Sequence, residues 1–333
     1  MRATRKTYSQ GTSGQNDHWG AYTCKIATST YTKSTSRLWN GLFLPEWKRN
    51  LIKDRPIAHL QAGHMGLQSY QLPDGVYAIP PHLLDLRSDT EIDWDLMNPV
   101  PVHNEMNIWF FWHSGFAHMH QYTQRNIRAW HRRFSRLGWV VRVLDNWPAS
   151  ASNVANFLEL DLETFPRAFI DKTIGGDDAF QHMSDLVRWP LLLRYGGVYA
   201  DVGIMQIGDL DKLWGQTVCN ANSPIEVLSY TMAGVEGQDQ SLSNYFMASN
   251  KHNPFFQRCH RLLLALWNGK TATKGMHSSP LLEALPRIGK GSNTCIEEYG
   301  ETHGPEEASK LLTDYMIQGI SIGLYTTFPS LSH

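Results

Sequence analysis

The sequence predicts an α/β protein with a Rossmann-type, mostly parallel sheet flanked by helices, built as a single elaborated domain. Two runs rich in β-forming residues, 107–112 and 139–144, have the length and composition of buried strands. A third run, 198–201, directly follows a helical segment that stops at Gly196 and Gly197. Strands that alternate with helices in this way are typical of parallel sheets.

The helices expected between and after these strands follow from local signals. Residues 121–136 carry Ile127, Trp130 and Phe134 on one side and several arginines on the other, the pattern of an amphipathic helix. Ser184 is a favourable N-cap for the helix that leads to the third strand. The other expected elements are a mostly helical stretch at 153–169, a glycine-rich loop at 175–178, a helix at 210–214, a strand within 245–249 and a helix at 254–267 opened by proline.

Composition divides the chain into three parts. Residues 1–40 are rich in Ser, Thr, Lys and Arg with Asp17 as their only acid, and we expect a polar, flexible extension there. Residues 41–100 are expected to be an irregular lead-in, because prolines at positions such as Pro80 and Pro99 break regular structure. The predicted α/β domain occupies residues 101–333.

Charge and hydropathy limit the possible partners. The formal net charge is −1, so no overall basic field indicates a nucleic-acid ligand, and no apolar run approaches the roughly 18 residues of a membrane span. The first 40 residues also contain no hydrophobic region, and the four cysteines have no CxxC spacing. We therefore expect a cytoplasmic protein with free thiols and no membrane span.

The segment 184–201 concentrates the polar residues that could carry chemistry. Asp185 and Arg188 are three residues apart on a predicted helix, so they share one face and can pair with each other. Asp201 follows three residues expected to be buried, at the carboxyl end of a strand, where ligands bind in open α/β sheets. A carboxylate in that position needs a partner, such as a metal, a sugar hydroxyl or an arginine.

This segment has the pattern S-D-L-x-R-x-x-x-L-x-x-Y-G-G-V-Y-x-D, which resembles the donor-sugar region of glycosyltransferases of the GT-A fold. It resembles in particular the capsular polysaccharide synthesis family and its fungal relatives. Residues 107–115, 139–145, 253–258 and 275–280 resemble further segments of that family, so the similarity covers roughly residues 100–285. The resemblance implies a GT-A-like fold and transfer of a sugar from a nucleotide-sugar donor to an unknown acceptor hydroxyl.

The resemblance also implies roles for single residues. Asp201 is the first candidate for a catalytic residue, Asp185 would orient the donor sugar, and Arg188 would neutralise the diphosphate, although Asp185 and Arg188 could equally form a structural salt bridge. Near the first two strands, the candidate nucleotide-binding residues are Trp112, which could stack on a base, His113 and Ser114 in the following turn, and Asp145, which could bind a ribose hydroxyl. A core tryptophan and plain turn residues explain these positions as well.

The expected metal site departs from the usual pattern. Many enzymes of this fold hold Mn²⁺ or Mg²⁺ with Asp-x-Asp, whereas Gly203 here replaces the second carboxylate after Asp201. One carboxylate plus donor phosphates can still hold such a cation, and His277 is a further candidate ligand, though a solvated loop histidine is the commoner case. The literal Asp-x-Asp at Asp209 and Asp211 is interpreted as a helix cap.

Two other functions remain open on the sequence alone. The scaffold could be a metal-independent acyl or aminoacyl transferase that uses a charged tRNA, or a noncatalytic binding module. The basic residues that could contact tRNA, or form a solvated helix face, are Arg125, Arg128, Arg132, Arg133, Arg136 and Arg142. Glu236 and Asp239 are candidates for a general base, with solvated loop acids as the simpler interpretation.

Overall fold

The structure is a computed structural model that describes residues 79–206, 208–232, 241–285, 287–288 and 304–327. All of them belong to one compact unit, Leu72–His333. Five strands form one sheet in the order β2-β1-β3-β5-β4. Their bounds are β1 Asn107–Phe111, β2 Val140–Leu144, β3 Gly197–Ala200, β4 Val227–Met232 and β5 Ser241–Ser249.

The centre of the sheet is parallel. β1 pairs in parallel with β2 on one side and with β3 on the other, whereas β5 runs antiparallel to both β3 and β4. Among the strands that the structure describes, β5 alone therefore points against the common direction of the others. This confirms the predicted α/β class and the prediction that the three sequence-derived strands are neighbours.

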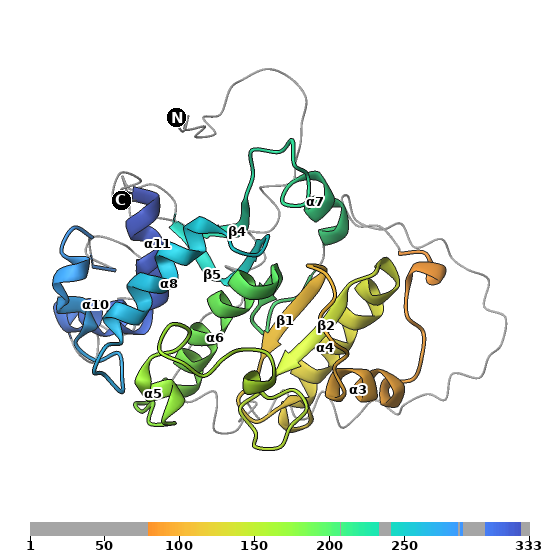
Figure 1. The fold of residues 1–333 in the computed structure, drawn as a ribbon, viewed down its shortest axis with the longest axis horizontal. Helices are drawn as coiled ribbons and strands as arrows, with labels where there is room; N and C mark the ends of the chain where they lie inside the picture. The colour runs from red at the N-terminus through yellow and green to blue at the C-terminus, as the bar shows by residue number, and fades with distance from the viewer. Residues whose placement is uncertain (1–78, 207, 233–240, 286, 289–303, 328–333) are drawn as a thin grey trace, which may run out of the picture. The chain divides into compact units, whose positions relative to one another are not determined.

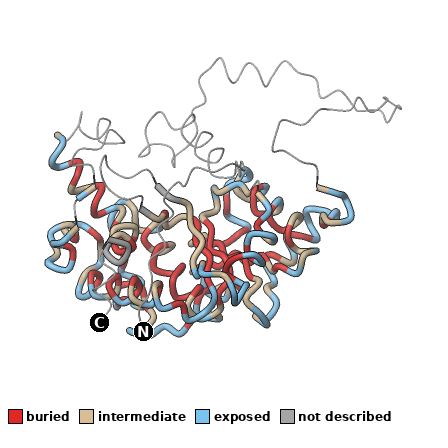
Figure 2. Tube along the Cα trace, turned by 90° about the horizontal axis from the view of Figure 1, so that it is seen from above, coloured by how far each residue is buried: buried red, intermediate tan, exposed pale blue. Residues whose placement is uncertain are grey.

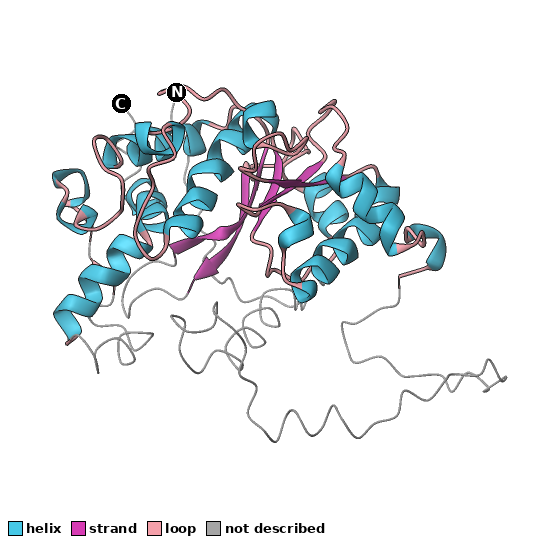
Figure 3. Cartoon of the chain, turned by 90° about the horizontal axis from the view of Figure 1, so that it is seen from below, coloured by secondary structure: helices cyan, strands magenta, loops and turns pink. Residues whose placement is uncertain are grey.

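Helices cover both faces of the sheet (Figures 1 and 3). They span α3 Asp89–Met97, α4 Gln121–Phe134, α5 Arg167–Ile170, α6 Ala179–Tyr195, α7 Leu210–Gln216, α8 Pro254–Leu266, α10 Pro305–Tyr315 and α11 Ile317–Thr327. Trp109 and Phe111 of β1 pack with α6, α8 and α11, while the alternate residues Ile108 and Phe110 pack with α3, α4 and α7. Buried residues therefore gather in the strands and in the helix faces turned towards them (Figure 2).

Two of these helices confirm the local signals in the sequence. α4 buries Ile127, Trp130 and Phe134, as its apolar periodicity predicts. α8 opens with Pro254 after Asn253, whose side chain accepts hydrogen bonds from the next backbone amides. None of the helices that the structure describes is long and apolar enough to cross a membrane.

The helix before β3 begins earlier than predicted. α6 starts at Ala179, so Ser184 lies inside the helix and is not its N-cap. Its hydroxyl instead contacts the hydroxyl of Tyr199 at 2.7 Å, across to β3. Residues 179–183 form an additional turn of this helix. His182, in this turn, is buried and contacts Asp185 and Thr273, and these contacts stabilise the turn.

Two other segments differ from expectation. Residues 153–169 are not mostly helical, because the Asp161 side chain bonds to the amides of Glu163 and Thr164 in a turn, and Pro166 then precedes the short α5. The segment expected to be irregular contains α3, which a capping box between Ser88 and Glu91 opens. This capping box is present in the sequence as Ser88 followed three residues later by Glu91, and it outweighs the effect of the nearby prolines.

The link between α6 and β3 depends on glycine. Gly196 and Gly197 have φ angles of +67° and +96°, a region that residues with a Cβ rarely adopt. A Cβ on Gly197 would collide with the carbonyl oxygen of Asn107 and lie 2.8 Å from that of Glu105. The backbones of β1 and β3 can therefore approach only because this side chain is absent.

We predict that Gly197→Ala lowers the free energy of unfolding by at least about 2 kcal/mol, through backbone strain and displacement of β1. Urea denaturation followed by circular dichroism measures the change. The matched control is Gly215→Ala in α7, where a Cβ meets nothing within 4 Å. It should be neutral or stabilise by up to about 1 kcal/mol, and equal effects of the two variants would contradict the prediction.

Candidate functional site

A buried arginine with two carboxylates lies beside the carboxyl end of β3. Arg188 of α6 is 3% exposed, and its Nη2 lies 2.8 Å from Asp185 Oδ1 and 3.2 Å from Asp201 Oδ1. The same nitrogen donates to Ser184 Oγ at 3.1 Å, and Nη1 donates to the main-chain oxygen of Asn244. The predicted trio of Asp185, Arg188 and Asp201 is thus brought together.

The two carboxylates of this centre differ in their access to ligands. Asp185 is buried, whereas the Asp201 side chain is 41% exposed. Burial of the surrounding site raises the pKa of Asp201 to about 6, an effect that Arg188 opposes and the negative charge of Asp185 strengthens. Burial acts to lower the pKa of Arg188, but Asp201 and Asp185 more than offset this and raise it above its usual value.

The donors of Arg188 are directed at the protein. They bind Asp185, Asp201, Ser184 and the Asn244 carbonyl, and the guanidinium also lies 4.9 Å above the Tyr199 ring. This arrangement supports a role in holding the two carboxylates, and it does not offer a free guanidinium fork to a diphosphate. With both acids ionised, the trio carries a net charge of −1.

Three residues that sequence reasoning missed hold Asp185 in place. Asn244 Nδ2 of β5 donates to Asp185 Oδ1 at 3.3 Å, and Gln318 Nε2 of α11 donates to the Asp185 main-chain oxygen at 2.6 Å. His182 Nδ1 lies 3.5 Å from Asp185 Oδ2, with Thr273 Oγ1 3.1 Å from its Nε2. His182 could have been identified, because it lies three residues before Asp185 on the same helix.

The predicted nucleotide loop follows β1. Trp112 and Ser114 are half-buried, and the His113 ring stacks on Phe180 of α6 with centroids 3.7 Å apart and an interplanar angle of 11°. Burial lowers the pKa of His113. The loop thus contacts the first turn of the helix that carries Asp185 and Arg188.

The Asp145 side chain stabilises the turn that follows β2. Its two oxygens accept hydrogen bonds from the Trp147 amide at 3.0 Å and the Ser150 hydroxyl at 2.7 Å, and the side chain is buried. Burial raises the pKa of Asp145. Of the two interpretations that the sequence left open, this geometry favours the turn residue over the ribose contact.

The His277 side chain is paired with Asp314 and not with Asp201. Its Nδ1 lies 3.0 Å from both carboxylate oxygens of Asp314 in α10, and the same carboxylate accepts from the backbone amides of Gly275 and His277. In the part of the chain that the structure describes, no three His, Cys, Asp or Glu side chains are grouped as they would be to hold a metal ion. Of the two candidate metal ligands, Asp201 and His277, only Asp201 lies in the Arg188 centre.

The loop after Asp201 is fixed to α4. Asn126 Nδ2 donates to the carbonyls of Val202 and Ile204, and Trp130 Nε1 also donates to Ile204. Arg133 donates to the carbonyls of Gln206 and Gly208. Asp209 caps α7 through the Lys212 amide, and Asp211 accepts from Trp139 Nε1, which agrees with the predicted cap.

The arginine cluster is largely engaged within the protein. Arg128 and Arg132 pair with Asp93 and Asp89, and Arg142 is buried and bound to Asn107. These contacts weaken the case for a tRNA-binding surface on α4. Glu236 and Asp239, the candidate bases, lie outside the described residues.

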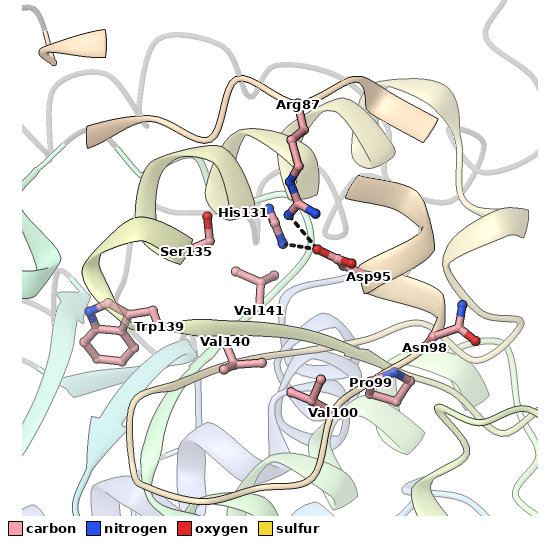
Figure 4. Close-up of a pocket in the computed structure, with 10 residues that line it drawn as sticks. All are labelled: Arg87, Asp95, Asn98, Pro99, Val100, His131, Ser135, Trp139, Val140 and Val141. Atoms are coloured by element: carbon pink, nitrogen blue, oxygen red, sulfur yellow. Dashed lines mark hydrogen bonds and ion pairs between the residues drawn. The ribbon is translucent and has the colours of Figure 1, made fainter. Parts of the chain in front are cut away.

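A separate cavity of about 240 Å³ lies at the start of β2, away from the strand ends that carry Asp201. Arg87 and His131 point towards Asp95 at its wall, at 2.6 and 3.7 Å (Figure 4). Arg87 also binds Asp85 at 2.7 Å. This cluster ties α3 to α4.

The strand order and the centre beside it define a Rossmann-type α/β protein with its polar residues at the carboxyl ends of the parallel strands. The sequence model described as capsular polysaccharide synthesis protein matches residues 77–274, and the chain belongs to that family. The resemblance stated from the sequence is thereby confirmed.

Three fungal relatives share substantial identity with the chain. It is 34% identical to O-glycosyltransferase braB of Annulohypoxylon truncatum, over 75% of this chain and 58% of that protein. It is 37% identical to the probable glycosyltransferase FCK3 of Fusarium pseudograminearum, over 62% and 50%, and 32% identical to O-glycosyltransferase PaGT of Phomopsis amygdali, over 74% and 59%. The chain therefore spans 50% to 59% of the length of these relatives.

We predict that Arg188→Met lowers the free energy of unfolding by about 3–5 kcal/mol, because it leaves the buried Asp185 without its cation. Urea denaturation measures the loss. The double variant Asp185→Asn/Arg188→Met removes both charges and should recover part of it. A double variant no more stable than Arg188→Met alone would contradict the coupling.

We also predict that Gly203→Asp, which restores Asp-x-Asp, changes the free energy of unfolding by less than about 0.5 kcal/mol. Gly203 is exposed, its φ is not positive, and a Cβ there meets nothing within 4 Å. Gly115→Ala is the contrasting variant, since Gly115 has φ +83° and its Cβ would lie 3.0 Å from Asp145 Oδ2. Thermal melts should show destabilisation only for Gly115→Ala.

Proposed function

We propose that this protein is a glycosyltransferase that moves a sugar from a nucleotide-sugar donor to an acceptor hydroxyl. The observation that carries the proposal is the position of the Arg188 centre. The chain passes from β1 to β2 on one side and then returns to β3 on the other, so the strand order reverses between β1 and β3. Ligands of doubly wound sheets bind at such a point, and both Asp201 and the His113 loop border it. The glycosyltransferase names of the relatives support the same activity.

The proposed mechanism begins with the exposed face of Asp201. Its carboxylate accepts hydrogen bonds from donor-sugar hydroxyls, while Arg188 behind it fixes its orientation and balances part of its charge. Asp185 contributes from a buried position, through Arg188 and Asn244. In this assignment Asp201 is the catalytic residue, and Asp185 and Arg188 are positioning residues.

The leaving nucleoside diphosphate needs positive charge, which the trio does not supply at its net charge of −1. A Mn²⁺ or Mg²⁺ ion bound by Asp201 and the donor phosphates would neutralise that group. Asp201 suits this role because one face of its side chain is open. The protein would hold such an ion weakly unless donor is present.

The direct test is a thermal-shift screen of the full chain against UDP-, GDP- and CDP-sugars, with and without Mn²⁺. The proposal expects stabilisation by one nucleotide class, since a ligand that binds only the folded state raises its melting temperature. Release of nucleoside diphosphate from the donor that binds then reports turnover without knowledge of the acceptor. No shift with any nucleotide sugar would contradict the proposal.

We predict that Asp201→Asn abolishes donor turnover without lowering the melting temperature at pH 7. The raised pKa of Asp201 means that the folded state holds this proton up to about pH 6, while the unfolded state releases it near pH 4. The free energy of unfolding of the wild type therefore falls as the pH rises from about 4 to about 6. The neutral amide of Asp201→Asn does not titrate, so the variant avoids that loss.

The same pKa sets the pH dependence of the reaction. If the ionised carboxylate acts, kcat/KM should fall about tenfold per pH unit below about pH 6 in the wild type. A wild-type profile that is flat from pH 5 to 7, or wild-type turnover in Asp201→Asn, would place the chemistry on another residue.

A further inference from the structure

Phe180 is an exposed aromatic residue beside the candidate site that the mechanism above does not use. It lies in the first turn of α6 and is 54% exposed. One face of its ring stacks on His113, with centroids 3.7 Å apart and planes 11° from parallel. Among the described residues it makes no other ring contact, so its second face is not covered by an aromatic neighbour.

The stack and the Arg188 centre share one side of α6. Phe180, Ser184 and Arg188 are spaced by four residues, so they follow one another along the same helix face. At a rise of 1.5 Å per residue, Phe180 and Arg188 are about 12 Å apart along the axis. A nucleotide sugar has the same bipolar character, with a flat base at one end and a charged, hydroxyl-rich portion at the other.

The His113 side of the stack belongs to the switch point of the sheet. His113 follows β1, and the backbone amide of Asn146, two residues beyond β2, donates to its main-chain oxygen at 3.2 Å. β1 in turn pairs with β3, whose carboxyl end leads to Asp201. The stack of Phe180 on His113 and the Arg188 centre are therefore held in place by neighbouring strands as well as by α6.

We propose that Phe180, backed by His113, is the stacking platform for the base of the nucleotide donor. This inference rests on the proposed function and assigns a residue to its base-binding end. Burial lowers the pKa of His113, so the imidazole is neutral at pH 7 and stacks as an uncharged ring. Because every base has a π-face, such a platform contributes affinity for any base and leaves the choice of base to other contacts.

The test is isothermal titration of this chain, as wild type and as Phe180→Ala, with UDP, GDP, CDP and inorganic pyrophosphate, each with Mn²⁺. Loss of base stacking should weaken the nucleoside diphosphate that the wild type binds by about tenfold or more. Pyrophosphate has no base, so its affinity should be unchanged. Phe180→Trp, which keeps a flat ring, should retain nucleotide affinity within about threefold.

Trp94→Ala is the matched control. Trp94 is an aromatic residue of α3 that is 66% exposed, and α3 packs on the side of the sheet opposite α6. Its removal should alter neither nucleotide nor pyrophosphate binding. Melting curves of each variant confirm that the loss at Phe180 is not a loss of folding.

The outcomes separate the two proposals. Nucleoside diphosphate affinity that is unchanged in Phe180→Ala overturns the platform while the glycosyltransferase function stands. An equal loss of pyrophosphate and nucleotide affinity also overturns it, since the residue would then shape the whole site. A wild type that binds none of the nucleoside diphosphates overturns the proposed function, and the platform with it.

Discussion

The arrangement of the site depends on the burial of one positive charge. A guanidinium that is 3% exposed is stable only if its donors are matched by acceptors and its charge by carboxylates. Asp185, Ser184, Asp201 and the Asn244 carbonyl supply them, and they come from α6, from the end of β3 and from β5. Arg188 therefore fixes the relative placement of a helix and two antiparallel strands, and Gln318 adds α11 through Asp185.

This constraint explains why the two carboxylates behave differently. The Asp185 carboxylate contacts Arg188 and His182 of α6 and Asn244 of β5, so its oxygens are occupied by the protein. Asp201 shares only one oxygen with Arg188 and keeps an open face at the strand end. The centre thus has one partly exposed carboxylate, and Arg188 orients it and balances part of its charge.

Much of the fold and of the candidate site could be predicted from the sequence, and the parts that could not be predicted have a physical reason. Strands β1, β2 and β3 are recognisable because buried parallel strands need continuous β-forming runs, and the Asp185–Arg188 pair follows from helical spacing. The start of α6 was missed because its extra turn is stabilised by His182, whose partner Thr273 is distant in sequence. Asn244 and Gln318 leave no local signal for the same reason. Phe180 carries no local signal because its neighbour His113, in the loop after β1, is distant in sequence.

The missing second carboxylate is best understood through the loop that follows Asp201. Asn126, Trp130 and Arg133 all donate to carbonyl oxygens between Val202 and Gly208. Side chains of α4 thus satisfy the backbone of this loop, and its course does not depend on a bound ion. Gly203 lies within this loop, and a Cβ there would meet nothing within 4 Å. The backbone could therefore carry an aspartate at this position, and the second carboxylate is missing only because the residue is glycine. A cation at this edge would then be organised by Asp201 and the donor phosphates, and its binding would be coupled to that of the donor.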